Sequence, residues 1–128
     1  MRKCILIHTD LKYEVVELPD DDTFNDEVYK LLNCSCWEGV PGMFGTYLMV
    51  DESGKLKNPP KKENLLANSL YPGFLFSNDV LVGNVLVSKI GTNEDNESDL
   101  VSLSDKDIKY ISDSLKLAKK AISKYGGK

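Results

Sequence analysis

Few side chains in this sequence have the chemistry for catalysis. His8 is the only histidine, so any nucleophile–histidine arrangement would have to use it, and no serine stands in a nucleophile-elbow motif. The phosphate-binding loops G-x-x-x-x-G-K-[ST] and G-x-G-x-x-G are absent. Carboxylates cluster in two runs, 20–22 and 94–99, whose polar surroundings would not raise a pKa for acid catalysis. We expect a protein that is not an enzyme and has no catalytic residues.

The three cysteines are Cys4, Cys34 and Cys36, and this odd number is typical of free thiols in a reducing compartment. Cys34 and Cys36 form a C-x-C pair, which on a strand would point both sulfurs to one face. Such a pair would supply two metal ligands, whereas a structural zinc site needs four. We favour small buried hydrophobic side chains over a metal site, and we expect no cofactor.

The residues that could bind a ligand centre on the run DVLVGNVLV at 79–87. A continuous apolar run predicts a strand covered on both faces, and Gly83 and Asn84 lie in its middle. Glycine in a strand marks a bulge or a close approach by another group. A buried asparagine needs partners, because an unpaired amide costs about 1–3 kcal/mol. Asn84 is therefore either structural, at a bulge, or a ligand-binding residue.

Two surfaces are further candidates for binding. The aromatic candidates are Trp37, Phe44, Tyr47, Tyr71, Phe74 and Phe76. The run 71–76 lacks polar alternation, which indicates that part of it forms a stacking surface or an interface. The two carboxylate runs would form an acidic surface able to imitate phosphate groups toward a DNA-binding partner.

Length and charge restrict the classes of function. A chain of 128 residues fits one domain. The net charge of -4 and a single arginine, Arg2, argue against direct nucleic-acid binding. No run of about 18 apolar residues predicts a membrane span, and the apolar run 4–7 is too short for a signal peptide. We expect a cytoplasmic protein.

Periodicity and turn residues predict the elements that position these side chains. The expected strands are 3–9, 12–18, 34–40, 43–51 and 79–87, and the expected helices are 24–32, 63–70 and 104–123. Thr23 is expected to cap the first helix and Asn33 to end it. In the short helix 63–70, Leu65, Leu66 and Leu70 are expected to face inward. Segment 91–99 is predicted to be a mobile acidic loop.

The last helix has the clearest pattern. Ser104 and Asp107 form a near capping box. The apolar stripe consists of Ile108, Ile111, Leu115, Ala118 and Ile122. The stripe would pack on the sheet or, alternatively, on a partner. The whole pattern predicts one α+β domain over residues 1–128, an antiparallel-rich sheet of five or six strands with a C-terminal amphipathic helix on one face.

The order of several short motifs resembles a family of small domains of unknown function found in phages, prophages and plasmids of Gram-positive bacteria. The motifs are Cys36-Trp37-Glu38, Val50-Asp51-Glu52-Ser53-Gly54-Lys55-Leu56, Asn58-Pro59-Pro60, Asn64-Leu65-Leu66-Ala67, Val82-Gly83-Asn84-Val85-Leu86-Val87 and Leu103-Ser104-Asp105. Cys34-Ser35 stands where the family has Gly-Gly, and Asn64-Leu65 where it has Asn-Arg. Some of the small mobile-element proteins around this family are similar to anti-Thoeris sponges, which bind cyclic ADP-ribose-type signals.

This resemblance implies a non-enzymatic counter-defence protein that sequesters a nucleotide-derived immune signal in the host cytoplasm. Phe74 or Phe76 would then stack on a base and Asn84 would hydrogen-bond the ligand, while the candidate cations for its phosphates are Lys57, Lys61 and Lys62. The alternative is a protein-interaction inhibitor of a defence nuclease, an anti-CRISPR or anti-restriction factor with an acidic or aromatic surface. We also expect a homodimer or a higher homo-oligomer, because open strand edges favour self-association.

Overall fold

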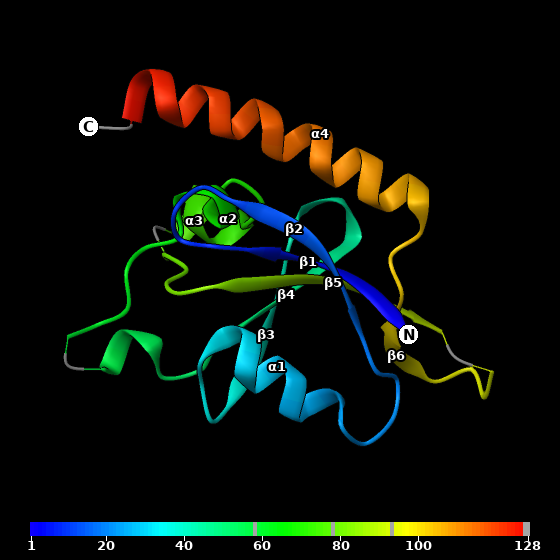
Figure 1. The fold of residues 1–128 in the computed structure, drawn as a ribbon. Helices are drawn as coiled ribbons and strands as arrows, with labels where there is room; N and C mark the ends of the chain where they lie inside the picture. The colour runs from blue at the N-terminus through cyan, green and yellow to red at the C-terminus, as the bar shows by residue number, and fades with distance from the viewer. Residues whose placement is uncertain (58, 78, 93, 127–128) are drawn as a thin grey trace.

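The structure is a computed structural model that describes residues 1–57, 59–77, 79–92 and 94–126 (Figure 1). Its strands are β1 (Arg2–Ile7), β2 (Tyr13–Leu18), β3 (Trp37–Pro41), β4 (Thr46–Asp51), β5 (Val85–Thr92) and β6 (Ser98–Val101). Its helices are α1 (Phe24–Leu32), α2 (Leu65–Asn68), α3 (Pro72–Ser77) and α4 (Asp105–Ala121). Short helical turns form η1 (Met43–Gly45), η2 (Gly54–Leu56) and η3 (Ile122–Gly126).

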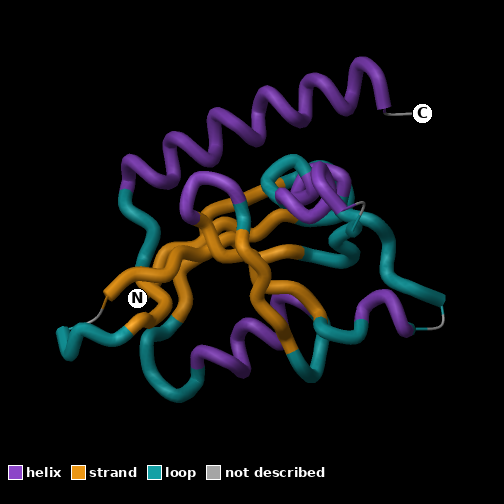
Figure 2. Tube along the Cα trace, turned by 180° about the vertical axis from the view of Figure 1, so that it is seen from behind, coloured by secondary structure: helices purple, strands orange, loops and turns teal. Residues whose placement is uncertain are grey.

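The described strands form one six-stranded sheet in the order β2-β1-β5-β4-β3, with β6 paired to the end of β5. Every pairing is antiparallel. Helix α4 crosses one face of the sheet with α2 and α3 beneath it, and α1 lies on the opposite face (Figures 1 and 2). The predicted α+β domain, with an antiparallel sheet and a C-terminal helix on one face, is confirmed.

Alternating strand residues build a core on each face of the sheet. On the α4 side, Ile7, Val85 and Val87 pack with Ile111 and Leu115 of α4. On the α1 side, the buried residues are Cys4, Leu6, Leu18, Phe24, Val28, Leu32, Met49 and Leu86. Helices cover both faces, so a central strand has no solvent side, and this explains why β5 begins with the apolar residues Val85, Leu86 and Val87.

The last helix follows the predicted pattern closely. The Ser104 hydroxyl accepts a hydrogen bond from the Asp107 backbone N–H, and the Asp107 carboxylate accepts one from the Ser104 N–H, which completes a capping box. Ile111 and Leu115 are buried, and Ile108 and Ala118 pack beside them. Within the described part of the chain, no helix combines the length and the apolar composition needed to cross a membrane.

The central prediction for segment 79–87 is wrong in its boundaries. Strand β5 starts at Val85, so Gly83 and Asn84 precede it and form no bulge. Gly83 has φ +75, and a Cβ there would lie 2.8 Å from Cδ of Lys61. The glycine therefore permits a left-handed turn and the close approach of a lysine stem. Among the described residues of the predicted strand that precede β5, Val82 forms an isolated β-bridge with Glu63.

Other expected boundaries also shift. Strand β3 begins at Trp37, which leaves Cys34 and Cys36 outside it. Segment 43–45 is the turn η1 rather than strand, and the second predicted helix shortens to α2 with Leu65 exposed. The loop expected at 91–99 is shorter, because residues 91–92 belong to the end of β5 and residues 98–99 to the start of β6. Thr23 precedes α1 without a side-chain cap, and its own N–H and hydroxyl donate to Asp21.

Candidate functional site

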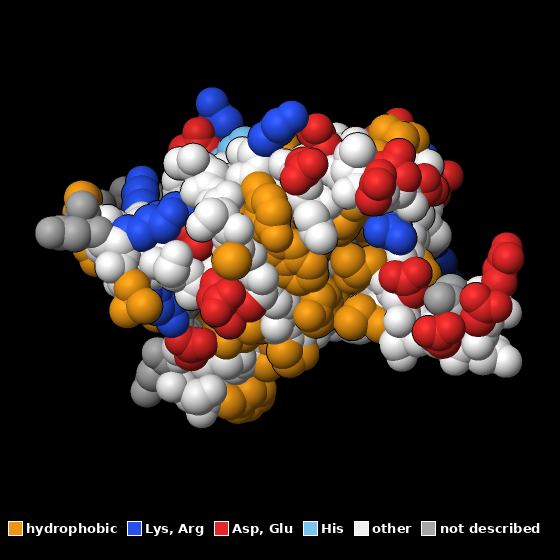
Figure 3. All heavy atoms as spheres, turned by 90° about the horizontal axis from the view of Figure 1, so that it is seen from below, with side chains coloured by type: hydrophobic (Ala, Val, Ile, Leu, Met, Phe, Trp, Pro, Cys, Tyr) orange, Lys and Arg blue, Asp and Glu red, His pale blue; other side chains and the backbone are white. Residues whose placement is uncertain are grey.

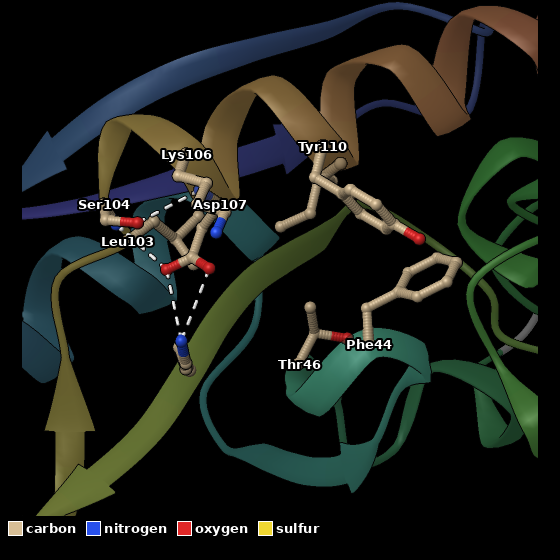
Figure 4. Close-up of a pocket in the computed structure, with 9 residues that line it drawn as sticks. Phe44, Thr46, Leu103, Ser104, Lys106, Asp107 and Tyr110 are labelled. Atoms are coloured by element: carbon tan, nitrogen blue, oxygen red, sulfur yellow. Dashed lines mark hydrogen bonds and ion pairs between the residues drawn. The ribbon is translucent and has the colours of Figure 1, made fainter.

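A pocket of about 460 Å³ lies between the first turns of α4 and the turn η1 (Figure 4). We name it the α4–η1 pocket. Its lining residues are Phe44, Thr46, Lys89, Leu103, Ser104, Lys106, Asp107, Tyr110 and Ile111. The volume falls in the range of about 300–1,000 Å³ that is typical of sites for small molecules.

Two aromatic rings, Phe44 from η1 and Tyr110 from α4, form one side of this pocket (Figure 4). Their centroids are 4.9 Å apart and their planes meet at 76°, an edge-to-face contact. Phe44 is 53% exposed and Tyr110 is 56% exposed. Both rings therefore retain surface on which a planar ligand can stack.

The backbone holds Phe44 in a conformation that large side chains avoid. Its φ of 63° and ψ of 29° are left-handed, which costs roughly 1–2 kcal/mol for a residue other than glycine. The turn is fixed on both sides: Met43 N–H donates to Leu70 O over 2.8 Å, and the Thr46 hydroxyl donates to Met43 O over 2.6 Å. Strain of this kind concentrates at functional sites.

Charged side chains lie beside the rings. The Lys89 ammonium is 3.3 Å from both carboxylate oxygens of Asp107. The backbone hydrogen bond from Ser104 is the main cause that lowers the pKa of Asp107, and Lys89 acts in the same direction. Lys106 is exposed and forms no ion pair with any described residue. The pocket thus combines ring faces with one paired and one unpaired ammonium group.

A second, shallower depression of about 220 Å³ contains three of the residues predicted to bind a ligand. Lys61, Lys62 and Asn84 line it, together with Thr9, Leu32, Asn33 and Gly83. Lys62 is exposed, and it forms no ion pair with the residues that the structure describes. The structure brings these three predicted residues together.

Asn84 and Lys61 both bind the C-terminal end of α1. Asn84 Nδ2 donates to Leu31 O over 3.1 Å. Lys61 Nζ donates to Leu32 O over 2.7 Å and to Asn33 O over 2.8 Å. A helix leaves its last carbonyls without partners, and a cation there also faces the negative end of the helix dipole. The ammonium of Lys61 and one amide N–H of Asn84 are therefore already engaged within the fold.

Lys57 and Lys61 share a buried carboxylate. Each ammonium lies 2.9 Å from Oδ2 of Asp51, whose side chain is 1% exposed. That oxygen has no directed hydrogen bond, so the contacts are ion pairs. Burial alone would raise the pKa of Asp51, but the two ammonium groups outweigh it and lower the pKa to about 2. Lys57 also lines a shallow surface beside Cys34 and Lys30.

The two predicted aromatic residues lie apart from these depressions. Phe74 and Phe76 belong to α3, and neither lines the Asn84 depression or the α4–η1 pocket. Phe76 is 86% exposed and Phe74 is 43% exposed. A single ligand site that unites these rings with Asn84 is not found among the described residues.

The candidate nucleophiles and metal ligands are also dispersed. His8 pairs with Glu14 at 2.8 Å in the β1–β2 hairpin. Burial raises the pKa of the Cys4 thiol to about 11, and burial, with the carboxylate of Asp51 nearby, raises that of Cys34. Among the residues that the structure describes, no three histidine, cysteine or acidic side chains gather into a possible metal site.

Phe44 is one of the aromatic candidates from the sequence, but no sequence pattern predicts that its ring lies beside Tyr110. Tyr110 occupies the exposed side of α4, outside the apolar stripe, and this was the only available signal. The residues of the α4–η1 pocket come from segments 44–46, 89 and 103–111, which only the sheet order brings together.

Comparison with known proteins gives a family and no function. No curated protein matches the chain, and no solved structure matches it. A family model described as "Domain of unknown function (DUF3846)" matches residues 1–116, which include every strand and most of α4. The chain belongs to this family of unknown function.

Proposed function

We propose that this protein is a non-enzymatic binding protein that holds a small planar, anionic ligand in the α4–η1 pocket. The observation that carries the proposal is the exposed ring pair of Phe44 and Tyr110 beside Lys89 and Lys106. Rings offer stacking surface to a base, and ammonium groups attract phosphate as point charges. A nucleotide derivative has both features.

The backbone of Phe44 supports a binding role over a purely structural one. Asparagine or glycine would fit the left-handed conformation at this position with less strain. The ring contact with Tyr110 is worth about 0.5–1.5 kcal/mol, which at most offsets that strain. The fold therefore gains little from an exposed phenylalanine here, whereas a stacked ligand would use its ring.

The biological setting that fits such a binder is sequestration of a signal. A phage- or plasmid-borne protein of this kind would remove a nucleotide-derived immune messenger from the host cytoplasm by binding it, in the manner of the anti-Thoeris sponges. Turnover is not required, which agrees with the dispersed positions of His8 and the three cysteines. We also propose a homodimer or a higher homo-oligomer. Strands β2 and β3 are both edge strands, and an open edge can pair with a second copy of the chain.

One observation favours the alternative of a protein-interaction inhibitor. Viewed from below, hydrophobic side chains gather in the middle of the molecule and acidic groups lie around them (Figure 3). The partly buried apolar residues beside the α1-side core are Val16, Leu31, Cys34, Trp37, Tyr47 and Leu100. An apolar centre with a charged border is the usual anatomy of a protein interface.

The two functions differ in their response to small molecules. Thermal unfolding would be measured with cyclic nucleotides, linear nucleotides and cyclic ADP-ribose isomers. A ligand at about 100 times its Kd adds about 2.7 kcal/mol to the free energy of unfolding, a shift of several degrees in Tm. A shift with one of these compounds supports the binder. No shift with any of them contradicts it and favours the protein-interaction inhibitor.

Phe44→Asn is expected to separate ligand binding from folding. Asparagine tolerates the left-handed backbone, so the free energy of unfolding should stay within about 1 kcal/mol of the parent. Affinity for the stabilising nucleotide should fall by about tenfold or more, equivalent to about 1.4 kcal/mol. Urea unfolding and isothermal titration would measure the two effects.

The matched variant is Phe76→Asn, which makes the same exchange on the exposed side of α3. Lys62→Ala probes the second depression without disturbing the α1 contacts of Lys61 and Asn84. Both variants should bind like the parent. Loss of binding in either of them, with Phe44→Asn unchanged, would place the ligand at the residues predicted from the sequence instead.

A further inference from the structure

Charge is distributed unevenly along this acidic chain. Residues 114–128 contain five lysines and none of the chain's 20 acidic residues, so the rest of the molecule is more acidic than the net charge of -4 implies. Lys116, Lys119, Lys120, Ser123 and Lys124 line one open surface on the C-terminal half of α4 and on η3. We name it the lysine surface. It occupies the C-terminal half of α4, whereas the α4–η1 pocket lies at the first turns of the same helix.

Three lysines of this surface have no acidic partner among the described residues. Lys116, Lys119 and Lys120 are exposed, and none forms an ion pair with a described residue. Lys116 and Lys120 stand four residues apart on a helix, where like charges repel by about 0.2–0.5 kcal/mol. Lys119 and Lys120 lie in the last turn of α4, where the negative end of the helix dipole favours a cation, whereas Lys116 lies one turn earlier. An anion bound at the surface would remove the repulsion.

The composition of the surface selects among anionic partners. Cores of protein–protein interfaces are depleted in lysine and rely on aromatic and arginine residues, and the lysine surface has neither. Membrane-bound amphipathic helices bury a free apolar face, whereas the stripe of α4 already packs on the sheet. Repeated phosphates need only point charges at regular spacing, and residues 116 to 124 extend for about 12 Å of helix.

We propose that the lysine surface binds the phosphate backbone of a nucleic acid without sequence preference. The net charge of the chain argues against such contact, but attraction acts locally and is screened beyond about 10 Å at 0.1 M salt. The proposal involves neither Phe44 nor Tyr110, so it stands or falls independently of the small-molecule site.

The test is fluorescence anisotropy of a labelled 30-base-pair DNA duplex, and of the same length of single-stranded RNA, with the whole chain at 50 and 200 mM salt. Three lysine–phosphate contacts predict a log–log salt slope of about -2.7 on duplex DNA, a loss of about 40-fold in affinity between the two conditions. The triple variant Lys116→Gln, Lys119→Gln, Lys120→Gln should abolish binding, and each single variant should reduce the slope by about one.

The matched control is Lys12→Gln, Lys30→Gln, Lys109→Gln, which changes the net charge equally at exposed lysines elsewhere. Circular dichroism would verify that both triple variants fold, and the single variants remain informative if one does not. Equal loss in both triples, or no binding at 50 mM salt, would overturn the proposal. Binding to polyglutamate or to phosphatidylserine vesicles in preference to DNA would also overturn it and indicate an acidic protein or a membrane.

Discussion

Replacing Asn64 with alanine is expected to lower the free energy of unfolding by about 3–5 kcal/mol. Asn64 is 0% exposed and its side chain makes three hydrogen bonds. Nδ2 donates to Ile7 O and to Gly83 O, each over 2.9 Å, and Oδ1 accepts from the Ala67 N–H over 3.0 Å. Loss of the helix cap costs about 1 kcal/mol, and each buried carbonyl left without its donor costs about 1–3 kcal/mol.

Asn64→Asp would show which of these bonds matters most. The aspartate keeps an acceptor for the Ala67 N–H but sets a buried carboxylate against the carbonyls of Ile7 and Gly83. It should therefore destabilise at least as much as alanine, because a buried charge without a partner is costly. A mild effect of Asn64→Asp would indicate that capping of α2 is the main contribution.

The matched control for Asn64→Ala is Asn84→Ala. Asn84 is partly buried, and its side chain donates one described hydrogen bond, to Leu31 O. The expected loss is about 1 kcal/mol. Urea unfolding followed by circular dichroism would measure both variants. Equal losses would contradict the assignment of Asn64 as the residue that joins β1, the segment before β5, and α2.

The second large effect is a dependence of stability on acid pH through Asp51. Its pKa falls from 3.8 in the unfolded chain to about 2 in the fold, because the ammonium groups of Lys61 and Lys57 outweigh the effect of burial. A carboxylate with a lowered pKa stabilises the fold above about pH 4 and loses this contribution as the pH falls toward 2. The shift corresponds to about 2 kcal/mol.

Asp51→Asn isolates this contribution. At pH 7 the variant should be about 2–3 kcal/mol less stable than the parent, because Lys57 and Lys61 lose their buried anion. At pH 2 the difference should shrink to less than about 1 kcal/mol, since the parent carboxylate is then about half protonated in the fold and almost fully protonated in the unfolded chain. Chemical unfolding from pH 2 to pH 7 would follow the difference between the two proteins.

The control for Asp51→Asn is Asp113→Asn, an exposed partner of Lys109 on α4. Exposed ion pairs contribute about 0–1 kcal/mol, so this variant should match the parent at every pH within that range. A difference between Asp51→Asn and the parent that stays constant from pH 7 to pH 2 would show that the ion pairs of Asp51 do not supply its stability.

Local patterns were sufficient for the elements that carry their own signals. The β1–β2 hairpin, α1 with its end at Asn33, and α4 with its capping box follow from spacing and turn residues within a few positions of each element. Segment 79–87 was misassigned because apolar content does not show where pairing with β1 begins. That boundary depends on the left-handed turn at Gly83 and on Lys61, more than 20 residues away in the chain.

The fully buried asparagine is Asn64, whereas the sequence pattern favours Asn84. Asn84 lies in an apolar run, which favours a buried amide, whereas Asn64 lies within the short leucine-rich helix predicted over 63–70 and carries no local signal of burial. The full burial of Asn64 results from β1 and the segment before β5 meeting at its side chain. The α4–η1 pocket could not be predicted from the sequence for a related reason. No local rule places a phenylalanine in a left-handed turn.

The position of β1 inside the sheet has a consequence for the order of folding during synthesis. Strand β1 pairs on one side with β2 and on the other with residues 85–87 of β5. The β1–β2 hairpin therefore leaves the ribosome with two apolar faces uncovered, and the second neighbour of β1 follows some 80 residues later. We expect a nascent chain that ends before α4 to be prone to aggregation and to depend on chaperones, and release of α4 to coincide with formation of the native core.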